Sequence, residues 1–224
     1  MQHIDLAGRR VCKAVIFDFD YTLADSSTGV VECMNHALTT MGLPAGDPET
    51  VKALIGVSLA GSFEALAGHS HDGRFDEFQR LFLERADQVM LDSIRLFDTV
   101  RPVVGALAAG GIGLGIVSTK FRSRIEAFLG RDGLVQAFDV IVGGEDVAVH
   151  KPDPAGLVMA VERLGATPPE ALYVGDSVVD AQTAGRAGVP FVAVLSGVTP
   201  REAFAAYQPR AVIDDLSFLP ALLL

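Results

Sequence analysis

Short apolar segments recur along the chain and alternate with segments of helical periodicity. Six of these segments are rich in β-branched residues and are almost continuously hydrophobic, which is typical of strands covered on both faces. They span residues 11–17, 113–117, 138–142, 172–174, 191–195 and 211–213. Regular alternation of such strands with helices predicts an α/β fold built on a parallel, Rossmann-like sheet.

Helix start and stop signals lie between the predicted strands. A Pro-Asp-Pro turn at 152–154 favours a helix start, and Gly165 ends the apolar stripe that follows it. A second helix is predicted to begin after Ser177 and to end between residues 185 and 188.

One long region breaks the alternation. From about residue 26 to 96 there is no strand of comparable quality, only helical periodicity. The apolar stripes are Val30, Met34, Ala37 and Met41, and then Phe75, Phe78, Phe82, Ala86 and Val89. The block is too long for an ordinary crossover. We therefore expect an α/β core formed by 1–22 and 98–224, with an all-helical cap subdomain, 23–97, inserted after the first strand.

Composition narrows the classes of partner. Half of the residues are hydrophobic, which provides a sizeable core, and 28 acidic against 18 basic side chains give a net charge of −10. This charge argues against nucleic-acid and membrane-surface binding, both of which need a basic face. The long uncharged stretch at 103–119 is shorter than the roughly 20 residues of a membrane span.

The two cysteines, Cys12 and Cys33, are too few for a disulfide framework or a zinc cluster. They fit a reduced protein of the cytoplasm. We expect a soluble monomer or homodimer.

Candidate chemistry begins at the end of the first strand, where Asp18 and Asp20 lie two residues apart. Side chains at that spacing point the same way from a strand. Two carboxylates on an apolar strand are costly unless a metal ion or a lysine neutralises them. The alternative interpretation is a cluster of helix N-caps.

Three further polar turns favour the functional interpretation. The Ser-Thr-Lys turn at 118–120 follows the second strand and opens a helix, as a phosphate cradle does. Lys151, one of only four lysines, precedes another helix, and Asp176 and Asp180 lie at a third strand–helix turn. Each turn alone could be a cap, but together they indicate one site.

These motifs resemble those of the haloacid dehalogenase-like hydrolase superfamily, in the same order and over nearly the whole chain. They are the Asp-Phe-Asp-Tyr-Thr run at 18–22, Ser118, Lys151, and Gly175-Asp176 with Asp180. The helical block resembles the small cap of that superfamily. Within it, the chain is most similar to phosphoglycolate phosphatase-like and pyrophosphatase-like members.

The resemblance implies catalytic roles. Asp18 would be the nucleophile that forms an aspartyl-phosphate, and Asp20 would protonate the leaving group and later activate water. Lys151 would offset negative charge, and Asp180 would orient Lys151 or a metal-bound water. Mg²⁺ would be held by Asp18, the backbone carbonyl of Asp20, and Asp176.

The substrate is predicted to be a small phosphorylated metabolite. The substrate-binding residues expected are Thr22, Ser118, Thr119, Lys120 and, in a cap loop, Gly56. Relatives more often carry Gly at the position of Tyr21, and phosphoglycolate phosphatases more often show Thr-Asn-Lys at 118–120, so the identity of the substrate stays open.

The sequence thus predicts a Mg²⁺-dependent phosphatase acting on a phosphoglycolate-like phosphomonoester. The alternatives are an inorganic pyrophosphatase, a phosphonoacetaldehyde hydrolase that would use Lys52 to form a Schiff base, and a non-catalytic module that binds a phosphorylated ligand. The His69 and His71 pair is expected to be an exposed loop rather than a metal site.

Overall fold

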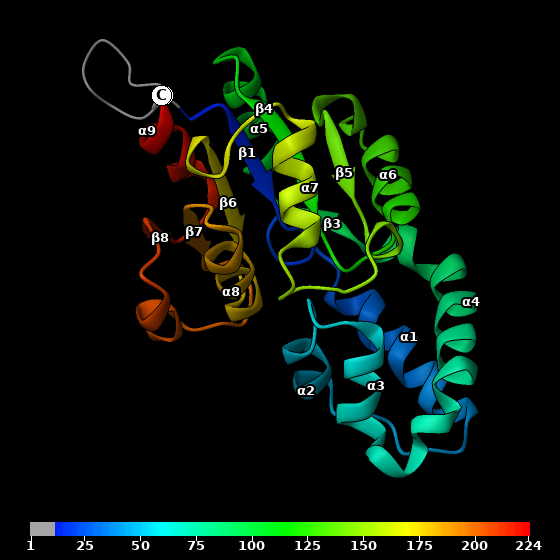
Figure 1. Ribbon diagram of the computed structural model, residues 1–224. Coiled ribbons are helices and arrows are strands. Elements are labelled where there is room, and N and C mark those ends of the chain that lie inside the picture. The colour runs from blue at the N-terminus through cyan, green and yellow to red at the C-terminus, as the bar shows by residue number, and fades with distance from the viewer. Residues whose placement is uncertain (1–11) are drawn as a thin grey trace. The chain divides into compact units, whose positions relative to one another are not determined.

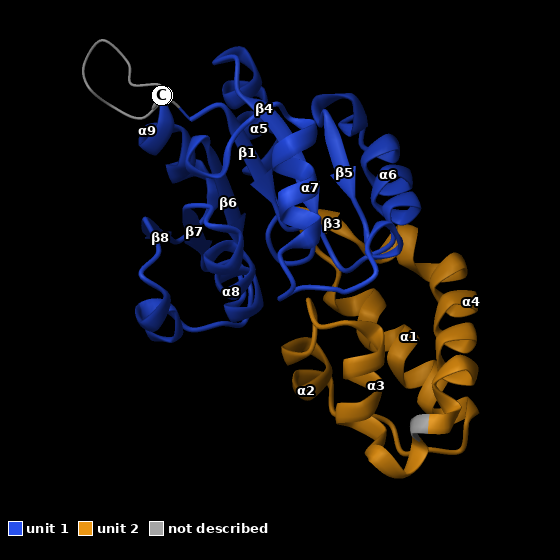
Figure 2. Ribbon diagram, viewed as in Figure 1, with its two compact units in different colours: residues 1–23, 97–224 blue, residues 24–96 orange. Residues whose placement is uncertain are grey.

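The computed structural model describes residues 12–224, apart from the side chain of Asp72. The chain divides into two compact units: unit 1 contains Met1–Leu23 and Phe97–Leu224, and unit 2 contains Ala24–Leu96 (Figure 2). These bounds lie within one residue of the divisions expected at 22/23 and 97/98. That the two units are separate domains stays a prediction.

Unit 1 contains a six-stranded, fully parallel sheet (Figure 1). In the order β5-β4-β1-β6-β7-β8, its strands are Val140–Val142, Gly113–Val117, Ala14–Phe17, Ala171–Gly175, Phe191–Val194 and Ala211–Ile213. All six predicted strands are confirmed, although β1 begins at Ala14 and residue 11 lies outside the described residues. The predicted α/β fold class, with a helical insertion after β1, is also confirmed.

Helices connect the parallel strands. The α-helices of unit 1 are α5 Val100–Ala109, α6 Arg122–Arg131, α7 Ala155–Arg163, α8 Val178–Ala187 and α9 Leu219–Leu223. Its short 3₁₀ helices are η2 Val135–Ala137, η3 Gly144–Asp146, η4 Pro168–Glu170, η5 Arg201–Tyr207 and η6 Leu216–Phe218. The predicted stop signals hold, since Gly165 and Gly188 follow α7 and α8 with φ angles of +64° and +67°.

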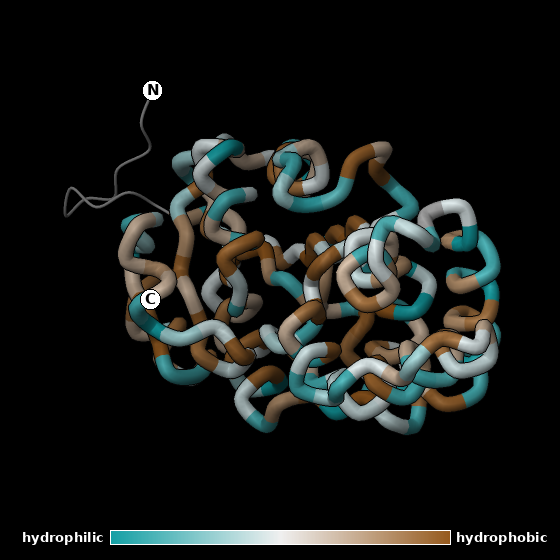
Figure 3. The backbone as a smooth tube through the Cα atoms, turned by 90° about the horizontal axis from the view of Figure 1, so that it is seen from below, coloured by the Kyte–Doolittle hydropathy of each residue, from teal (hydrophilic) through white to brown (hydrophobic). Residues whose placement is uncertain are grey.

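The core of unit 1 lies between its sheet and these helices. Leu157 and Val161 of α7 and Ala184 of α8 pack with Ile16 and Tyr173 of the central strands in one buried cluster. Helix α5 lies behind the sheet in Figure 1 and packs against β4 and α9. In Figure 3 the hydrophobic segments run mainly through the interior, and many outer turns are hydrophilic. The central strand β1 is fully buried, so its carboxyl end is held firmly.

Unit 2 is helical, as expected, with one short antiparallel strand pair. It consists of β2 Ala24–Asp25, α1 Ser27–Thr40, α2 Pro48–Ala53, α3 Leu59–Ala67, η1 His69–Arg74, α4 Phe75–Ser93 and β3 Arg95–Leu96. The two strands pair with each other. Two residues are too few to show a strand pattern, which is why the sequence did not reveal them.

The buried stripe of α1 is as predicted, but that of α4 is displaced. All four α1 positions are buried. On α4 the buried residues are Phe78, Leu81, Ala86 and Met90, whereas Phe75, Phe82 and Val89 are only half-buried. The ring of Phe63 in α3 stacks on Phe78 at 4.5 Å, and packing against α1 and α3 turns the buried face toward Leu81 and Met90. Hydrophobicity alone does not distinguish these neighbouring faces.

The inserted segment leaves and rejoins unit 1 at neighbouring residues. The backbone N–H of Phe97 donates to the carbonyl of Leu23 at 3.1 Å. On the unit 2 side, Ala24 pairs with Leu96.

Candidate active site

Parallel pairing places the predicted polar turns of unit 1 side by side. Phe17 of β1 is in register with Ile116 of β4 and with Val174 of β6. The backbone N–H of Asp18 continues this pairing by donating to the carbonyl of Val174 at 2.9 Å. Asp18, Ser118 and Asp176 therefore leave three adjacent strands at the same sheet edge.

Lys151 is enclosed by oxygen atoms. Its ammonium Nζ lies 2.8 Å from Asp18 Oδ1 and 2.7 Å from Asp180 Oδ1, and its side chain is only 4% exposed. The same ammonium donates to the hydroxyl of Tyr173 at 3.2 Å, and this hydroxyl is also 3.0 Å from Asp180 Oδ1. Tyr173 could not be identified from the sequence, because its partners lie in other segments and a tyrosine in a buried strand is expected to be core.

Asp180 is fixed by the start of helix α8. The backbone N–H and the hydroxyl of Ser177 both donate to Asp180 Oδ2, at 3.1 and 2.6 Å. The hydroxyl of Ser177 in turn accepts from the backbone N–H of Asp180 at 3.2 Å, which completes a capping box. A Cβ atom at Gly175 would lie 2.5 Å from the carboxyl carbon of Asp180, so only glycine fits there.

Asp176 is buried beside Thr22 and Gly197. The Thr22 hydroxyl donates to Asp176 Oδ1 across 3.4 Å, a long hydrogen bond. A Cβ atom at Gly197 would lie only 1.9 Å from Asp176 Oδ2, so the backbone of Gly197 passes directly over this carboxylate. This close approach was not predicted, since nothing in the sequence near residue 197 distinguishes it from an ordinary turn.

Asp20 lies against Lys120. The ammonium of Lys120 is 2.8 and 3.0 Å from the two carboxylate oxygens of Asp20, and it stands 5.8 Å above the ring centre of Phe19. Both charged side chains are more than nine-tenths buried. In this structure the side chain of Lys120 contacts Asp20. The predicted contact of Lys120 with substrate stays a prediction.

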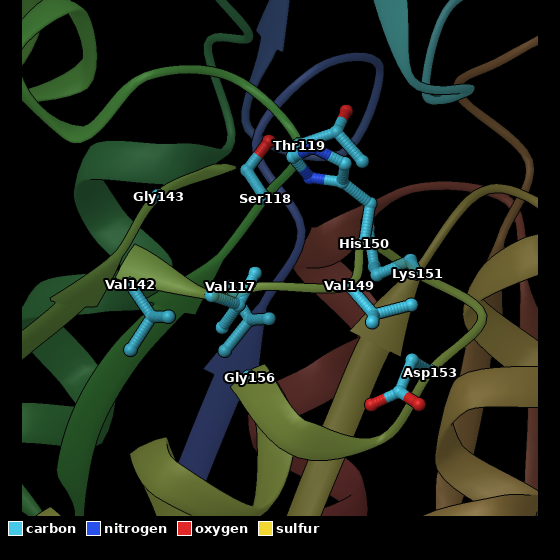
Figure 4. Close-up of a pocket in the computed structure, with 11 residues that line it drawn as sticks. Val117, Ser118, Thr119, Val142, Gly143, Val149, His150, Lys151, Asp153 and Gly156 are labelled. Carbon is cyan, nitrogen blue, oxygen red and sulfur yellow. The ribbon is translucent and has the colours of Figure 1, made fainter. Parts of the chain in front are cut away.

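Ser118 and Thr119 line a small pocket together with His150 and Lys151 (Figure 4). The hydroxyl of Ser118 accepts from the backbone N–H of Lys120 at 3.3 Å. A Cβ atom at Gly144 would lie 2.4 Å from the carbonyl oxygen of Thr119, so this turn depends on close backbone packing.

Tyr21 adopts a backbone conformation that favours glycine. Its φ angle is +59°, a left-handed conformation that costs a non-glycine residue about 1–2 kcal/mol. The hydroxyl of Ser196 donates to the Tyr21 carbonyl. The Tyr21 side chain is buried, and this packing helps to offset the conformational cost.

The predicted cap residues lie in unit 2. Gly56 is in the loop between α2 and α3 with a φ angle of +94°. Lys52 forms an exposed ion pair with Glu49 at 2.8 Å. His69 Nδ1 is 3.0 Å from the carboxylate of Glu64, and both side chains are largely exposed. His69 and His71 lie in the short 3₁₀ helix η1 rather than in the expected loop.

Burial and mutual repulsion raise the pKa values of two carboxyl groups of the site. Burial, strengthened by Asp180 and Asp20 and opposed by Lys151, raises the pKa of Asp18 to about 7. Burial also raises the pKa of Asp176 well above its usual value, with further repulsion from Asp180 and Asp18. Although burial disfavours a charged lysine, Asp18 and Asp180 hold the pKa of Lys151 well above its ordinary range.

The donor set fits a divalent cation that prefers oxygen. Asp18, Asp176 and Asp180 each offer a carboxylate oxygen within 4.8 Å of the others. Asp18 Oδ1 is buried and, within residues 12–224, accepts no well-aligned hydrogen bond, although Lys151 Nζ is near. Four buried carboxyl groups surround only two ammonium groups, so a cation such as Mg²⁺ would relieve the excess negative charge. The predicted ligand set has the Asp20 carbonyl where this cluster has Asp180.

Comparison with known proteins gives a consistent result. The family model described as "Haloacid dehalogenase-like hydrolase" matches residues 15–194. The phosphoglycolate phosphatase of Yersinia pseudotuberculosis is 32% identical to this chain, with 95% of this chain and 94% of that protein aligned. The one from Rhodospirillum rubrum is 37% identical, over 92% of this chain and 89% of that protein.

Solved structures agree on the fold. A haloacid dehalogenase-like hydrolase from Bacteroides fragilis superposes with a TM-score of 0.89 and 43% identity, covering 92% of this chain and 99% of that one. No helix among residues 12–224 is both long and apolar enough to cross a membrane.

Proposed function

The chain belongs to the haloacid dehalogenase-like hydrolases, and from that premise we propose that it is a Mg²⁺-dependent phosphatase of small phosphomonoesters. The observation that carries this proposal is the buried group of Asp18, Lys151 and Asp180 beside Asp176. A nucleophile, a fixed positive charge and metal-binding oxygens are thus collected at one sheet edge. A non-catalytic module has no need of this costly buried charge.

In the proposed reaction, Asp18 attacks the phosphorus atom. Its carboxylate forms a bond to phosphorus while the ester P–O bond breaks, and Asp20 gives a proton to the departing oxygen. Water then attacks the phosphorus of the aspartyl-phosphate, Asp20 takes a proton from that water, and Asp18 is regenerated with release of phosphate. Asp18 must be ionised to attack, which a pKa of about 7 permits at neutral pH.

Lys151 stabilises the charge that accumulates at Asp18. Its ammonium lies between Asp18 and Asp180, so phosphate oxygens drawn to Asp18 meet a fixed positive charge in a water-poor setting. Asp180, Ser177 and Tyr173 keep this ammonium in place.

The metal would be held by Asp18, Asp176 and either Asp180 or the backbone carbonyl of Asp20. A Mg²⁺ ion bound there would supply positive charge that offsets the charge of the phosphate oxygens. Thr22 acts here through its hydrogen bond to Asp176.

Phosphate binding is proposed for Ser118 and Thr119, whose turn leaves β4 beside Asp18. The predicted contact of Gly56 with substrate stays a prediction. A phosphoglycolate-like substrate is supported by the relatives that carry the name phosphoglycolate phosphatase.

Lys52 weighs against the phosphonoacetaldehyde hydrolase alternative. A lysine that forms a Schiff base must lose its proton, and burial usually promotes this loss. The carboxylate of Glu49 instead raises the pKa of the Lys52 ammonium. Pyrophosphatase activity uses the same core chemistry and stays an alternative.

The test is phosphate release from a panel containing phosphoglycolate, other phosphomonoesters, pyrophosphate and phosphonoacetaldehyde, with Mg²⁺ and with EDTA. We expect Mg²⁺-dependent release from a phosphomonoester, and at least a 10³-fold loss in the folded Asp18→Asn variant, because the nucleophile is gone. Wild-type turnover in that variant, or equal turnover in EDTA, would contradict the proposal. Preference for pyrophosphate would favour the pyrophosphatase.

A further inference from the structure

We infer that Lys120 is a positioning residue for Asp20, acting on the reaction by fixing that carboxylate rather than by binding the substrate. The inference rests on the proposed function, in which Asp20 transfers protons. Lys120 Nζ lies 2.8 and 3.0 Å from the two oxygens of Asp20, so a single ammonium restrains both ends of the carboxylate. Rotation of the Asp20 side chain would break at least one of these contacts.

The pair is buried, which makes it strong enough to hold a side chain. Exposed lysine–carboxylate pairs are worth little because water screens them. Here Lys120 is 9% and Asp20 7% exposed, and the ring of Phe19 lies beneath the ammonium. Removing one partner of such a pair leaves the other as an uncompensated buried charge.

The backbone of Lys120 is itself anchored. Its N–H donates to the hydroxyl of Ser118, and its carbonyl accepts from the N–H of Gly144 at 3.0 Å. The backbone of Lys120 is therefore held by the end of β4 and the start of η3, which are separate in sequence from the segment that carries Asp20. Lys120 thus links the ends of two adjacent strands, β1 and β4.

This geometry suits a group that transfers protons. A carboxylate can accept about four hydrogen bonds, so the Lys120 contacts leave acceptor positions on both oxygens of Asp20. Holding the proton donor at a fixed place removes the need to find it during the reaction. The ammonium of Lys151, by contrast, lies on Asp18 and Asp180, so the two lysines serve different carboxylates.

The test compares substrates that need a leaving-group proton with one that does not. Single-turnover release of the leaving group is measured for an alkyl phosphate and for p-nitrophenyl phosphate, at saturating Mg²⁺, in Lys120→Met and Lys120→Arg. We expect Lys120→Met to slow the alkyl phosphate about 10–100-fold more than p-nitrophenyl phosphate, since general acid catalysis contributes roughly 10²–10⁴-fold in total. The substrate concentration for half-maximal rate should change less than threefold.

Lys120→Arg should recover part of the lost alkyl phosphate rate, because a guanidinium can also contact both carboxylate oxygens. The matched control is Lys13→Met, which removes a lysine–carboxylate ion pair of 2.8 Å to Glu170 at the other end of β1. This control should leave both substrates unaffected.

Two outcomes would overturn the inference. Equal slowing of both substrates with a large rise in the half-saturating concentration would assign Lys120 to the substrate phosphate. Unchanged rates in Lys120→Met would show that Asp20 needs no such partner. If Lys120→Met does not fold, Lys120→Gln is read in the same way.

A double variant separates positioning from other effects. In an Asp20→Asn background, Lys120→Met should add less than a threefold loss for the alkyl phosphate, since the group it positions is already absent. Full additivity would contradict the inference. Failure of the wild-type protein to release phosphate from any substrate would instead refute the proposed function.

Discussion

Single residues decide how closely the backbone approaches the buried carboxylates. Gly197 passes over Asp176 and Gly175 passes beside Asp180, at distances that leave no room for a Cβ atom. The absence of a side chain therefore contributes to the site as directly as the carboxylates do.

Gly197→Ala is expected to weaken Mg²⁺ binding. Its new methyl group would collide with Asp176 Oδ2 and displace that carboxylate, and displacing groups that support a ligand typically costs 10–100-fold in metal affinity. Mg²⁺ titration by calorimetry measures the change. Gly105→Ala in α5, where nothing lies within 4 Å of the new methyl, should leave the affinity unchanged. Equal affinity in both variants would show that Gly197 does not constrain Asp176.

Residue type and place in the chain made part of the site predictable. Asp18 and Lys151 were identifiable because burying a charged group beside a strand or before a helix costs free energy unless an opposite charge or a ligand neutralises it. In the structure the ammonium of Lys151 lies 2.8 Å from a carboxylate oxygen of Asp18. Tyr173 and Gly197 were not identifiable, because their importance comes from neighbours far away in sequence that only the fold brings near.

At the scale of elements, the first turn of helix α8 contributes both to the stability of the helix and to the geometry of the site. Ser177 caps the helix, and the same serine holds the Asp180 carboxylate. Stability of the helix and geometry of the site are thus coupled through one hydroxyl.

Ser177→Ala should therefore lower both stability and metal affinity. Loss of an N-cap serine costs about 0.5–2 kcal/mol in unfolding free energy, measurable by urea denaturation. The freed Asp180 should also lower Mg²⁺ affinity several-fold. Ser58→Ala is the matched control, because Ser58 caps α3 in unit 2 by accepting from Gly61. It should lose similar stability with no change in Mg²⁺ affinity, and an equal affinity loss there would rule out the coupling.

The hydrophobic pattern of the sequence predicts some elements better than others. The six strands of the sheet were predictable because burial on both faces leaves a continuous apolar run. The displaced face of α4 was not, because α4 is apolar on both neighbouring stripes and its contacts with α1 and α3 select between them.

At the scale of the whole molecule, the buried carboxyl groups link stability to pH. Burial raises the pKa of Asp18 to about 7 and moves that of Asp176 in the same direction. The metal-free folded state therefore binds more protons than the unfolded state between pH 4 and pH 7. Stability from Asp18 is fully present below its unfolded pKa and is lost as pH rises through about 7.

Without metal, the stability contributed by these groups should therefore fall as pH rises from 5 to 8, and the melting temperature should fall with it. The proposed Mg²⁺ site requires ionised carboxylates, so the difference in melting temperature between Mg²⁺ and EDTA samples should widen over the same range. Differential scanning calorimetry at each pH checks this. Asp18→Asn should flatten the widening, whereas a difference that stays constant with pH in the wild type would contradict the shifted pKa values.

The neighbouring ends of the inserted segment have an evolutionary consequence. Leu23 and Phe97 are joined by a backbone hydrogen bond, and Ala24 pairs with Leu96 just beyond them. Any replacement segment need only match this short end-to-end spacing, and the strand order of the sheet is then undisturbed. A different inserted segment could therefore be joined to the same sheet at the same two peptide junctions.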